Sequence, residues 1–291
     1  MTTAPMLIRV IAHNIENRIL DMDIIDGIRE RDADVVLLVE GYEGSIDRAF
    51  LKSRLTELLP EYNHTLVDYR SKDKRRDEHG YIVLTKKDLG DVEITELDGP
   101  YRKFVSVKVA GGEIILVHVD DRSIFSRKAE TLWLLGYLGV AGKFTHPPVS
   151  QVIMGDFNST HHTEFIGKVL NFWLVSWFIG LLVALGLEVD PSEARGGRYK
   201  GLRLRIGKLV SLARRLRDMT SRRNTTLESF EADGLVDALE PGMVTRPLFK
   251  QIGVQLDHIL FDERAVSVGY PYGFVGKPSD HNGIAAELQW K

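Results

Sequence analysis

The chain has 291 residues, of which 44% are hydrophobic and 27% charged, and 38 basic against 41 acidic residues give a formal net charge of −3. This length fits one large domain or two small ones with a full hydrophobic core, and the composition excludes a disordered chain and a globally basic nucleic-acid-binding protein. Because the sequence contains no cysteine, disulfides, thiolate metal sites and cysteine nucleophiles are excluded as well.

The first apolar run predicts a strand rather than a secretory signal. Residues 6–12 are apolar except for Arg9, and polar residues follow without a small-residue cleavage pattern. Since no signal peptide is found, we expect an intracellular, cytoplasmic protein.

Short apolar runs then alternate with helical or polar stretches as far as residue 160. Strands are predicted at Leu7–Ala12, Asp34–Val39, Tyr81–Thr85, Phe104–Val109, Ile114–Val119 and Val152–Met154. Helices are predicted at about 21–31, 45–59 and 123–140, and Gly111–Gly112 predicts a hairpin turn. Beyond residue 224 the pattern predicts a short helix near 225–233 and strands near 255–261 and 284–290. This mixture is typical of a layered α/β or α+β domain.

Polar residues that can carry chemistry stand at the ends of the predicted strands, where a rigid sheet would hold them at its edge. They are His13, Asn14, Glu40, His118, Gly155–Asn158, Asp257 and Ser279–His281. Oxygen ligands such as Glu40 and Asp280, without cysteine or a paired-histidine spacing, favour Mg²⁺ or Mn²⁺ over zinc. A hard ion, a carboxylate that positions water and a histidine near developing charge together suit attack on phosphorus.

Residues 161–224 differ in composition from the rest of the chain. The segment 169–187 has 19 residues without a charge, 15 of them apolar, and as a helix it would be ~28 Å long, close to the ~30 Å hydrocarbon core of a bilayer. Residues 195–223 carry eleven basic residues and one acidic residue, a net charge of +10 that leaves −13 on the remainder. Apolar residues from Leu202 to Leu216 recur at helical spacing among these basic residues, which predicts a basic amphipathic helix.

Two kinds of partner fit this segment. Candidate site residues lie both before and after this segment. If they form one site, the chain must cross a bilayer an even number of times. The arginine-rich helix cannot provide the second crossing, because burying charged side chains in the hydrocarbon core costs too much free energy. We therefore expect the apolar helix to lie in one leaflet with the basic helix on anionic headgroups, so that 169–223 binds an anionic membrane surface peripherally. In the alternative, the apolar helix packs on protein and the basic helix binds nucleic acid.

The order of the strand-end motifs resembles that of the endonuclease/exonuclease/phosphatase superfamily, which includes pancreatic-type deoxyribonucleases, abasic-site endonucleases, neutral sphingomyelinases and inositol-polyphosphate phosphatases. The resemblance rests on GDFN at 155–158 and SDH at 279–281, and it covers residues 7–160 and 225–290. It implies an α/β (α+β) fold, a four-layer α/β sandwich of two packed mixed β-sheets flanked by helices. It also implies that residues 1–291 form a single catalytic domain carrying a helical insert at 161–224.

The same resemblance implies a metal site and a catalytic group. The metal site would contain Glu40, Asn14 and Asp280. Asp156 would position or deprotonate the attacking water, and Asn158 would fix the phosphate.

Three further residues would complete the catalytic group. His281 would contact the scissile phosphate, and Asp257 would orient His281 from behind. His118 matches the second histidine of the deoxyribonuclease and sphingomyelinase branches. The sequence departs from the family pattern beside the site, where His13 replaces a tryptophan and Val39 a glutamine.

Together these features predict a divalent-metal-dependent phosphoester hydrolase that acts on a phosphorylated headgroup at a membrane surface. The alternative is a metal-dependent endo- or exonuclease whose basic helix binds the nucleic-acid backbone, with strongly salt-dependent binding. A third hypothesis, a non-catalytic membrane scaffold on an inactive hydrolase fold, is disfavoured by the intact Glu40, Asp156, Asn158 and His281.

Overall fold

The computed structural model describes residues 6–69, 79–119, 124–141, 147–158, 225–239, 246–249, 252–254, 256–274 and 281–291. The chain divides into two compact units, Met1–Ser159 with Thr225–Lys291, and Thr160–Asn224. All of the described residues belong to the first unit. The two helices predicted within 161–224, and Asp280 of the predicted metal site, lie outside the described residues.

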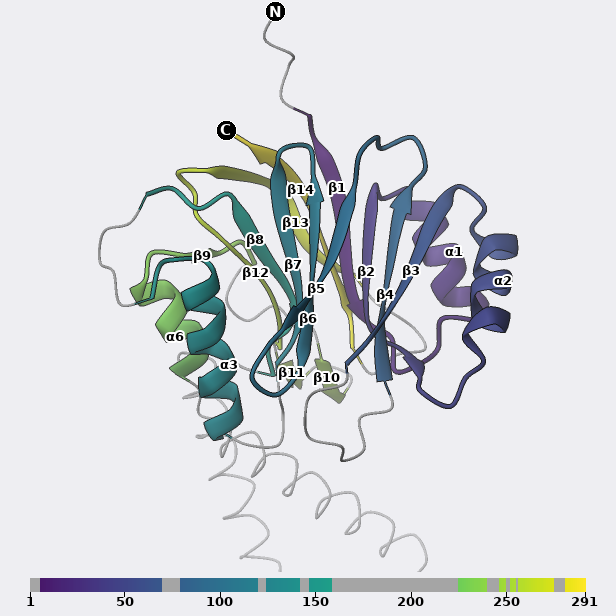
Figure 1. The fold of residues 1–291 in the computed structure, drawn as a ribbon, viewed down its shortest axis with the longest axis horizontal. Helices are drawn as coiled ribbons and strands as arrows, with labels where there is room; N and C mark the ends of the chain where they lie inside the picture. Colours follow the sequence, from purple (N-terminus) through teal and green to yellow (C-terminus); the bar gives the residue numbers. More distant parts are fainter. Residues whose placement is uncertain are drawn as a thin grey trace, which may run out of the picture. The chain divides into compact units, whose positions relative to one another are not determined.

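Two mixed sheets form the centre of the first unit (Figure 1). The six strands of one sheet, in spatial order, are β13 (Val266–Phe274), β14 (Gly283–Trp290), β1 (Ile8–Asn14), β2 (Val35–Glu43), β4 (His79–Lys86) and β3 (Tyr62–Asp68). The six strands of the other are β5 (Glu93–Asp98), β6 (Lys103–Val109), β7 (Gly112–His118), β8 (Gln151–Asp156), β12 (Asp257–Phe261) and β9 (Val236–Asp237). A separate hairpin joins β10 (Arg246–Phe249) to β11 (Ile252–Val254). Only β1–β2 and β7–β8 pair in parallel among the strands described.

Successive side chains of the buried strands face opposite sides of their sheet, which explains why each sheet is covered on both faces. In β2, Val35, Leu37 and Val39 face a core shared with the second sheet, whereas Val36 and Leu38 face the opposite side. Successive side chains of a strand point to opposite faces, so a strand that is apolar at every position must be covered on both.

Helices cover the two outer faces. The first sheet is covered by α1 (Met22–Arg31) and α2 (Arg48–Leu58), and the second by α3 (Ile124–Tyr137) and α6 (Thr225–Ala232). Both α1 and α2 begin after an aspartate N-cap, Asp21 and Asp47, whose carboxylate accepts main-chain N–H groups of the first turn. The layers therefore run helix, sheet, sheet, helix, which confirms the predicted four-layer sandwich.

Candidate active site

Three of the predicted catalytic residues lie side by side on neighbouring strands. His118 ends β7 and is in register with Asp156, which ends β8, and Asp156 is in register with Asp257 at the start of β12. Residues in register on adjacent strands project to the same face of a sheet. The pairing of β7, β8 and β12 thus places an imidazole and two carboxylates in one row.

The GDFN segment has a backbone that requires glycine at its first position and favours asparagine at its last. Gly155 has φ +131°, and a Cβ atom there would lie 2.2 Å from the carbonyl oxygen of Val117. Asn158 has φ +49°, its N–H donates to Asp156 Oδ1 at 2.8 Å, and its Nδ2 donates to the carbonyl of Val119 at 2.9 Å. Asn158 therefore fixes one oxygen of the Asp156 carboxylate and leaves the other facing the site.

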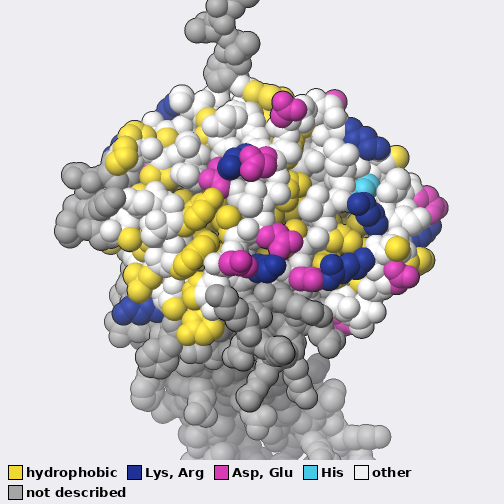
Figure 2. Space-filling model, viewed as in Figure 1, with side chains coloured by type: hydrophobic (Ala, Val, Ile, Leu, Met, Phe, Trp, Pro, Cys, Tyr) yellow, Lys and Arg dark blue, Asp and Glu magenta, His cyan; other side chains and the backbone are white. Residues whose placement is uncertain are grey.

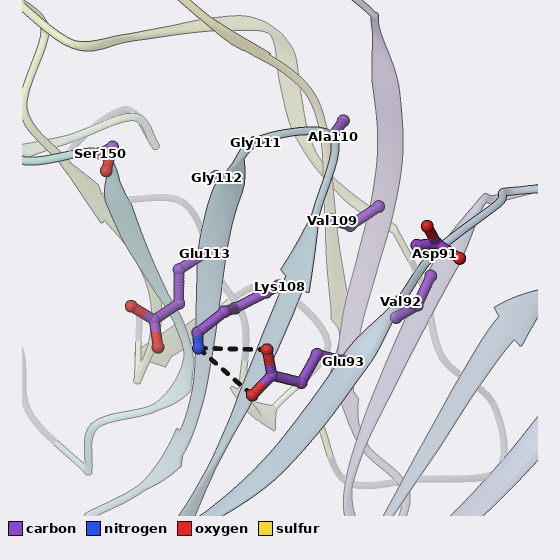
Figure 3. Close-up of a pocket in the computed structure, with 10 residues that line it drawn as sticks. All are labelled: Asp91, Val92, Glu93, Lys108, Val109, Ala110, Gly111, Gly112, Glu113 and Ser150. Atoms are coloured by element: carbon purple, nitrogen blue, oxygen red, sulfur yellow. Dashed lines mark hydrogen bonds and ion pairs between the residues drawn. The ribbon is translucent and has the colours of Figure 1, made fainter.

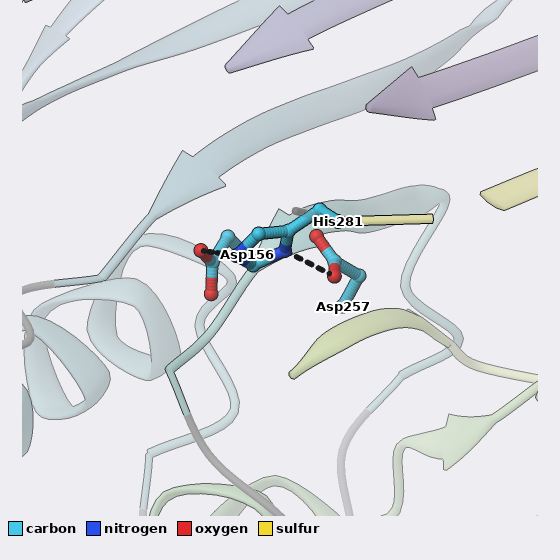
Figure 4. Close-up of side chains that lie close together, drawn as sticks. All are labelled: Asp156, Asp257 and His281. Carbon is cyan, nitrogen blue, oxygen red and sulfur yellow. Dashed lines mark hydrogen bonds and ion pairs between the residues drawn. The ribbon is translucent and has the colours of Figure 1, made fainter. Parts of the chain in front are cut away.

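His281 joins this row from the bend just before β14 of the first sheet (Figure 4). Its Nδ1 lies 3.0 Å from Asp257 Oδ2, and its Nε2 lies 3.7 Å from Asp156 Oδ2. A carboxylate accepts hydrogen bonds, so Nδ1 carries the hydrogen and Nε2 is directed at the Asp156 carboxylate. All three residues are 1–2% exposed.

Asn14 and Glu40 reach the same point from β1 and β2. Asn14 Nδ2 lies 3.4 Å from Glu40 Oε1 and 3.3 Å from Asp156 Oδ2. His118 Nε2 lies 3.6 Å from Glu40 Oε1 and 3.8 Å from Asp156 Oδ2. The Asn14 amide and the His118 imidazole thus each lie close to both Glu40, a carboxylate of the first sheet, and Asp156, a carboxylate of the second.

The donor set fits a hard divalent cation. A carboxylate oxygen of Asp156, one of Asp257 and a ring nitrogen of His281 lie within 4.8 Å of one another, but Asp257 and His281 already pair with each other. The carboxylates of Glu40 and Asp156 both approach Asn14 Nδ2, at 3.4 and 3.3 Å, and are the oxygen donors best placed for an ion. Oxygen-rich sites of this kind suit Mg²⁺ or Mn²⁺. Of the eight predicted site residues, the structure brings seven together, and Asp280 is outside the described part of the chain.

Two residues outside the predicted metal and catalytic groups support residues within them: His13, which the sequence places among the strand-end polar residues, and Tyr69, which it does not mark. His13 Nε2 lies 3.1 Å from the main-chain oxygen of His281, and since a carbonyl only accepts, Nε2 must carry the hydrogen. Burial lowers the pKa of His13 to about 4, so this histidine is neutral at pH 7. Tyr69, 1% exposed, accepts the main-chain N–H of Glu40 through its hydroxyl. No sequence motif marks either contact.

A surface hollow of about 540 Å³ lies at the other ends of β7 and β8, lined by residues such as Gly112 and Ser150 (Figure 3). Two of its charged side chains, Lys108 and Glu93, pair with each other at 3.3 Å. The carboxylate of Glu113 accepts hydrogen bonds from the hydroxyl groups of Ser106 and Tyr137. This hollow is therefore separate from the candidate active site.

The fold and the site define the class of the protein: an α/β sandwich with carboxylates and imidazoles gathered at the strand ends of two sheets. Residues 12–281 match the Endonuclease/Exonuclease/phosphatase family. The chain belongs to this family, whose members cleave phosphoester bonds. No curated protein sequence gives a significant match.

Solved structures of this family have the same fold. An endonuclease/exonuclease/phosphatase family protein from Bacteroides thetaiotaomicron is similar at 15% identity with a TM-score of 0.55, covering 99% of this chain and 100% of that one. An AP endonuclease from Archaeoglobus fulgidus is similar at 15% identity and a TM-score of 0.55, covering 96% and 98%. A mannosyl-6-phosphatase from Bacteroides thetaiotaomicron is similar at 13% identity and a TM-score of 0.52, covering 97% and 99%.

Proposed function

We propose that this protein is a Mg²⁺- or Mn²⁺-dependent phosphoester hydrolase whose active site contains Asn14, Glu40, His118, Asp156, Asn158, Asp257 and His281. The observation that carries the proposal is the shared contact of Glu40 and Asp156 with both Asn14 and His118, since it joins residues from four strands of two sheets at one point. Asp280 is proposed to join the metal site.

Each side chain has a role that its contacts support. Asp156, fixed through one oxygen by Asn158, orients or deprotonates the attacking water with the other. His281, held through Nδ1 by Asp257, directs Nε2 at the phosphoryl oxygens and stabilises charge in the transition state. When bound, the divalent ion would neutralise charge on the phosphate from the side of Glu40 and Asn14.

The proposed setting of the reaction is a membrane surface that presents a phosphorylated headgroup. Its support is the sequence of 169–223, in which a charge-free apolar stretch precedes a basic amphipathic one. Among the described residues, no helix is long and apolar enough to cross a membrane. Among the described residues on the face shown in Figure 2, acidic and basic side chains are intermixed.

The second candidate is a metal-dependent nuclease. The basic stretch 195–223 supports it because lysines and arginines bind a nucleic-acid backbone. The similarity of the fold to an AP endonuclease is compatible with it.

Plasmid nicking by the purified full chain separates the two candidates. The assay compares Mg²⁺ with EDTA, and wild type with His281→Ala, alongside hydrolysis of bis(p-nitrophenyl) phosphate. Metal-dependent nicking that the variant loses would favour the nuclease. Hydrolysis of the small diester without nicking would favour headgroup substrates, which are then presented in vesicles. If folded wild-type protein cleaves neither of these nor p-nitrophenyl phosphate or vesicle-borne headgroups, the proposed hydrolase activity is wrong.

A further inference from the structure

Glu40 occupies an irregular point of β2. The register of β2 against β4 shifts between Leu38 and Tyr42, so extra residues of β2 bulge out of the ladder, and Glu40 has φ +47°. A non-glycine residue in this left-handed region is strained and persists only when its surroundings hold it. The position of the Glu40 carboxylate therefore depends on what holds the bulge.

The Tyr69 hydroxyl supplies part of that support. It accepts the Glu40 N–H, a donor that a regular strand would give to a neighbouring strand's carbonyl. On the other side of the bulge, the Glu40 carbonyl accepts the N–H of Asn17 at 2.6 Å. The Glu40 main chain is thus held at both its donor and its acceptor.

Tyr69 itself is anchored to both sheets. Its N–H donates to the carbonyl of His79 at 3.2 Å, in the first sheet, and its carbonyl accepts the N–H of Lys103 at 3.4 Å, in the second. Its ring packs edge-on against Tyr81, with centroids 4.2 Å apart, and against His118, with centroids 5.4 Å apart. One buried side chain therefore contacts a site residue of each sheet, Glu40 through its hydroxyl and His118 through its ring.

We propose that Tyr69 is a positioning residue that sets the Glu40 carboxylate against His118 and so tunes the affinity of the site for its divalent cation. The proposal rests on the metal-dependent function proposed above. Because the hydroxyl and the ring make separate contacts, their effects are separable. Losing the hydroxyl frees the Glu40 bulge, whereas the ring continues to pack against the imidazole.

Tyr69→Phe tests this in the full chain because it removes one oxygen atom and keeps the ring. We expect the dissociation constant for Mn²⁺, measured by electron paramagnetic resonance without substrate, to rise about tenfold, as for other residues that orient metal ligands. At saturating Mg²⁺, kcat on bis(p-nitrophenyl) phosphate should stay within about twofold of wild type. Unchanged Mn²⁺ affinity in this variant would overturn the proposal.

Tyr62→Phe is the matched control. Tyr62 is also 1% exposed, and its hydroxyl donates to the carbonyl of Ala33 at 2.7 Å, away from the site. Loss of a buried hydroxyl should lower the thermal midpoint of both variants, but only Tyr69→Phe should weaken Mn²⁺ binding. An equal change in Mn²⁺ affinity in both would show a general loss of stability and overturn the positioning role.

Glu40→Gln separates this proposal from the proposed function. If wild type binds Mn²⁺ and Glu40→Gln binds it much more weakly, the metal site stands and Tyr69→Phe is judged alone. If wild type does not bind Mn²⁺, or Glu40→Gln binds it as wild type does, both proposals fail. Should Tyr69→Phe not fold, hydrogen exchange of the Glu40 amide in wild type decides, since rapid exchange would show that the bond to Tyr69 is absent.

Discussion

At the scale of single residues, the two oxygens of the Asp156 carboxylate have different partners. Its Oδ1 accepts the Asn158 N–H, while its Oδ2 is the atom nearest Asn14, His118 and His281. An asparagine at 156 keeps an oxygen for the Asn158 N–H but loses the charge and basicity that water activation requires.

We therefore expect Asp156→Asn to lower kcat on a soluble phosphodiester by at least about a hundredfold, with a thermal midpoint close to that of wild type. Steady-state kinetics and circular dichroism measure the two effects. The exposed Asp88→Asn controls for the loss of one negative charge and should leave turnover unchanged. Near-normal turnover in Asp156→Asn would contradict the role assigned to this carboxylate.

His13 makes the stability of the molecule sensitive to acid. Burial lowers the pKa of His13 to about 4 in the folded state, against 6.5 for an ordinary histidine. Between these pH values the unfolded chain binds a proton that the folded chain does not, so the free energy of unfolding falls as the pH falls below 6.5. From pH 7 to pH 4.5 this residue should remove roughly 2 to 3 kcal/mol of stability.

Urea unfolding of wild type and His13→Gln at both pH values measures this effect. Glutamine can still donate to the His281 carbonyl but does not titrate, so the variant should lose correspondingly less stability on acidification. Equal losses in the two proteins would show that His13 is not the group responsible.

At the scale of elements, the sequence predicts the central strands and misses the edges of both sheets. The predicted strands correspond to β1, β2, β4, β6, β7, β8, β12 and β14, each apolar on two faces or in clear alternation. The missed strands β3, β5, β9 and β13 are the outermost strands of the two six-stranded sheets, and the hairpin strands β10 and β11 are missed as well. An edge strand is covered less, so β5 is mostly exposed and β13 tolerates Gly269 and Pro271 around a register shift.

The close approach of β8 to β7 at Gly155 is also an element-scale constraint. A Cβ atom there would lie 2.2 Å from the Val117 carbonyl, and the backbone has φ +131°, so Gly155→Ala must force β7 and β8 apart beside His118 and Asp156. We expect a loss of at least about 2 kcal/mol in the free energy of unfolding, together with lost activity.

Gly136→Ala in α3 is the matched control for this substitution. A Cβ atom at position 136 would meet nothing within 4 Å, so alanine should be neutral or stabilise the helix by about 0.5 to 1 kcal/mol. Chemical denaturation measures both variants. A Gly155→Ala protein as stable as Gly136→Ala would show that β7 and β8 do not approach as closely as described.

At the scale of the whole molecule, the site exists because two sheets pack with the ends of their parallel strand pairs at one edge. The motif order, through the resemblance to the family, predicts that Asn14, Glu40, His118, Asp156 and His281 belong to one site, and the structure adds the parallel pairs β1–β2 and β7–β8 that bring the strand ends together. The supports of the site are not predictable in this way. Tyr69 and His13 act through main-chain atoms of Glu40 and His281, and such contacts depend on a bulge and on packing that no local pattern encodes.

The segment 169–223 is where the molecule's charge is most uneven, and its proposed role is to bring the active site to an anionic surface. Replacing Arg203, Arg205, Arg214 and Arg215 by glutamine removes four of its eleven basic charges, each worth about 1 kcal/mol near an anionic membrane. We expect binding to phosphatidylserine-containing vesicles, measured by co-sedimentation, to weaken at least tenfold, while hydrolysis of a soluble phosphodiester stays unchanged because the described site residues are untouched. Vesicles of phosphatidylcholine alone provide the uncharged control. If vesicle binding persists and plasmid binding is lost instead, the basic segment binds nucleic acid. If hydrolysis of the soluble substrate falls as well, the segment contributes to the active site itself.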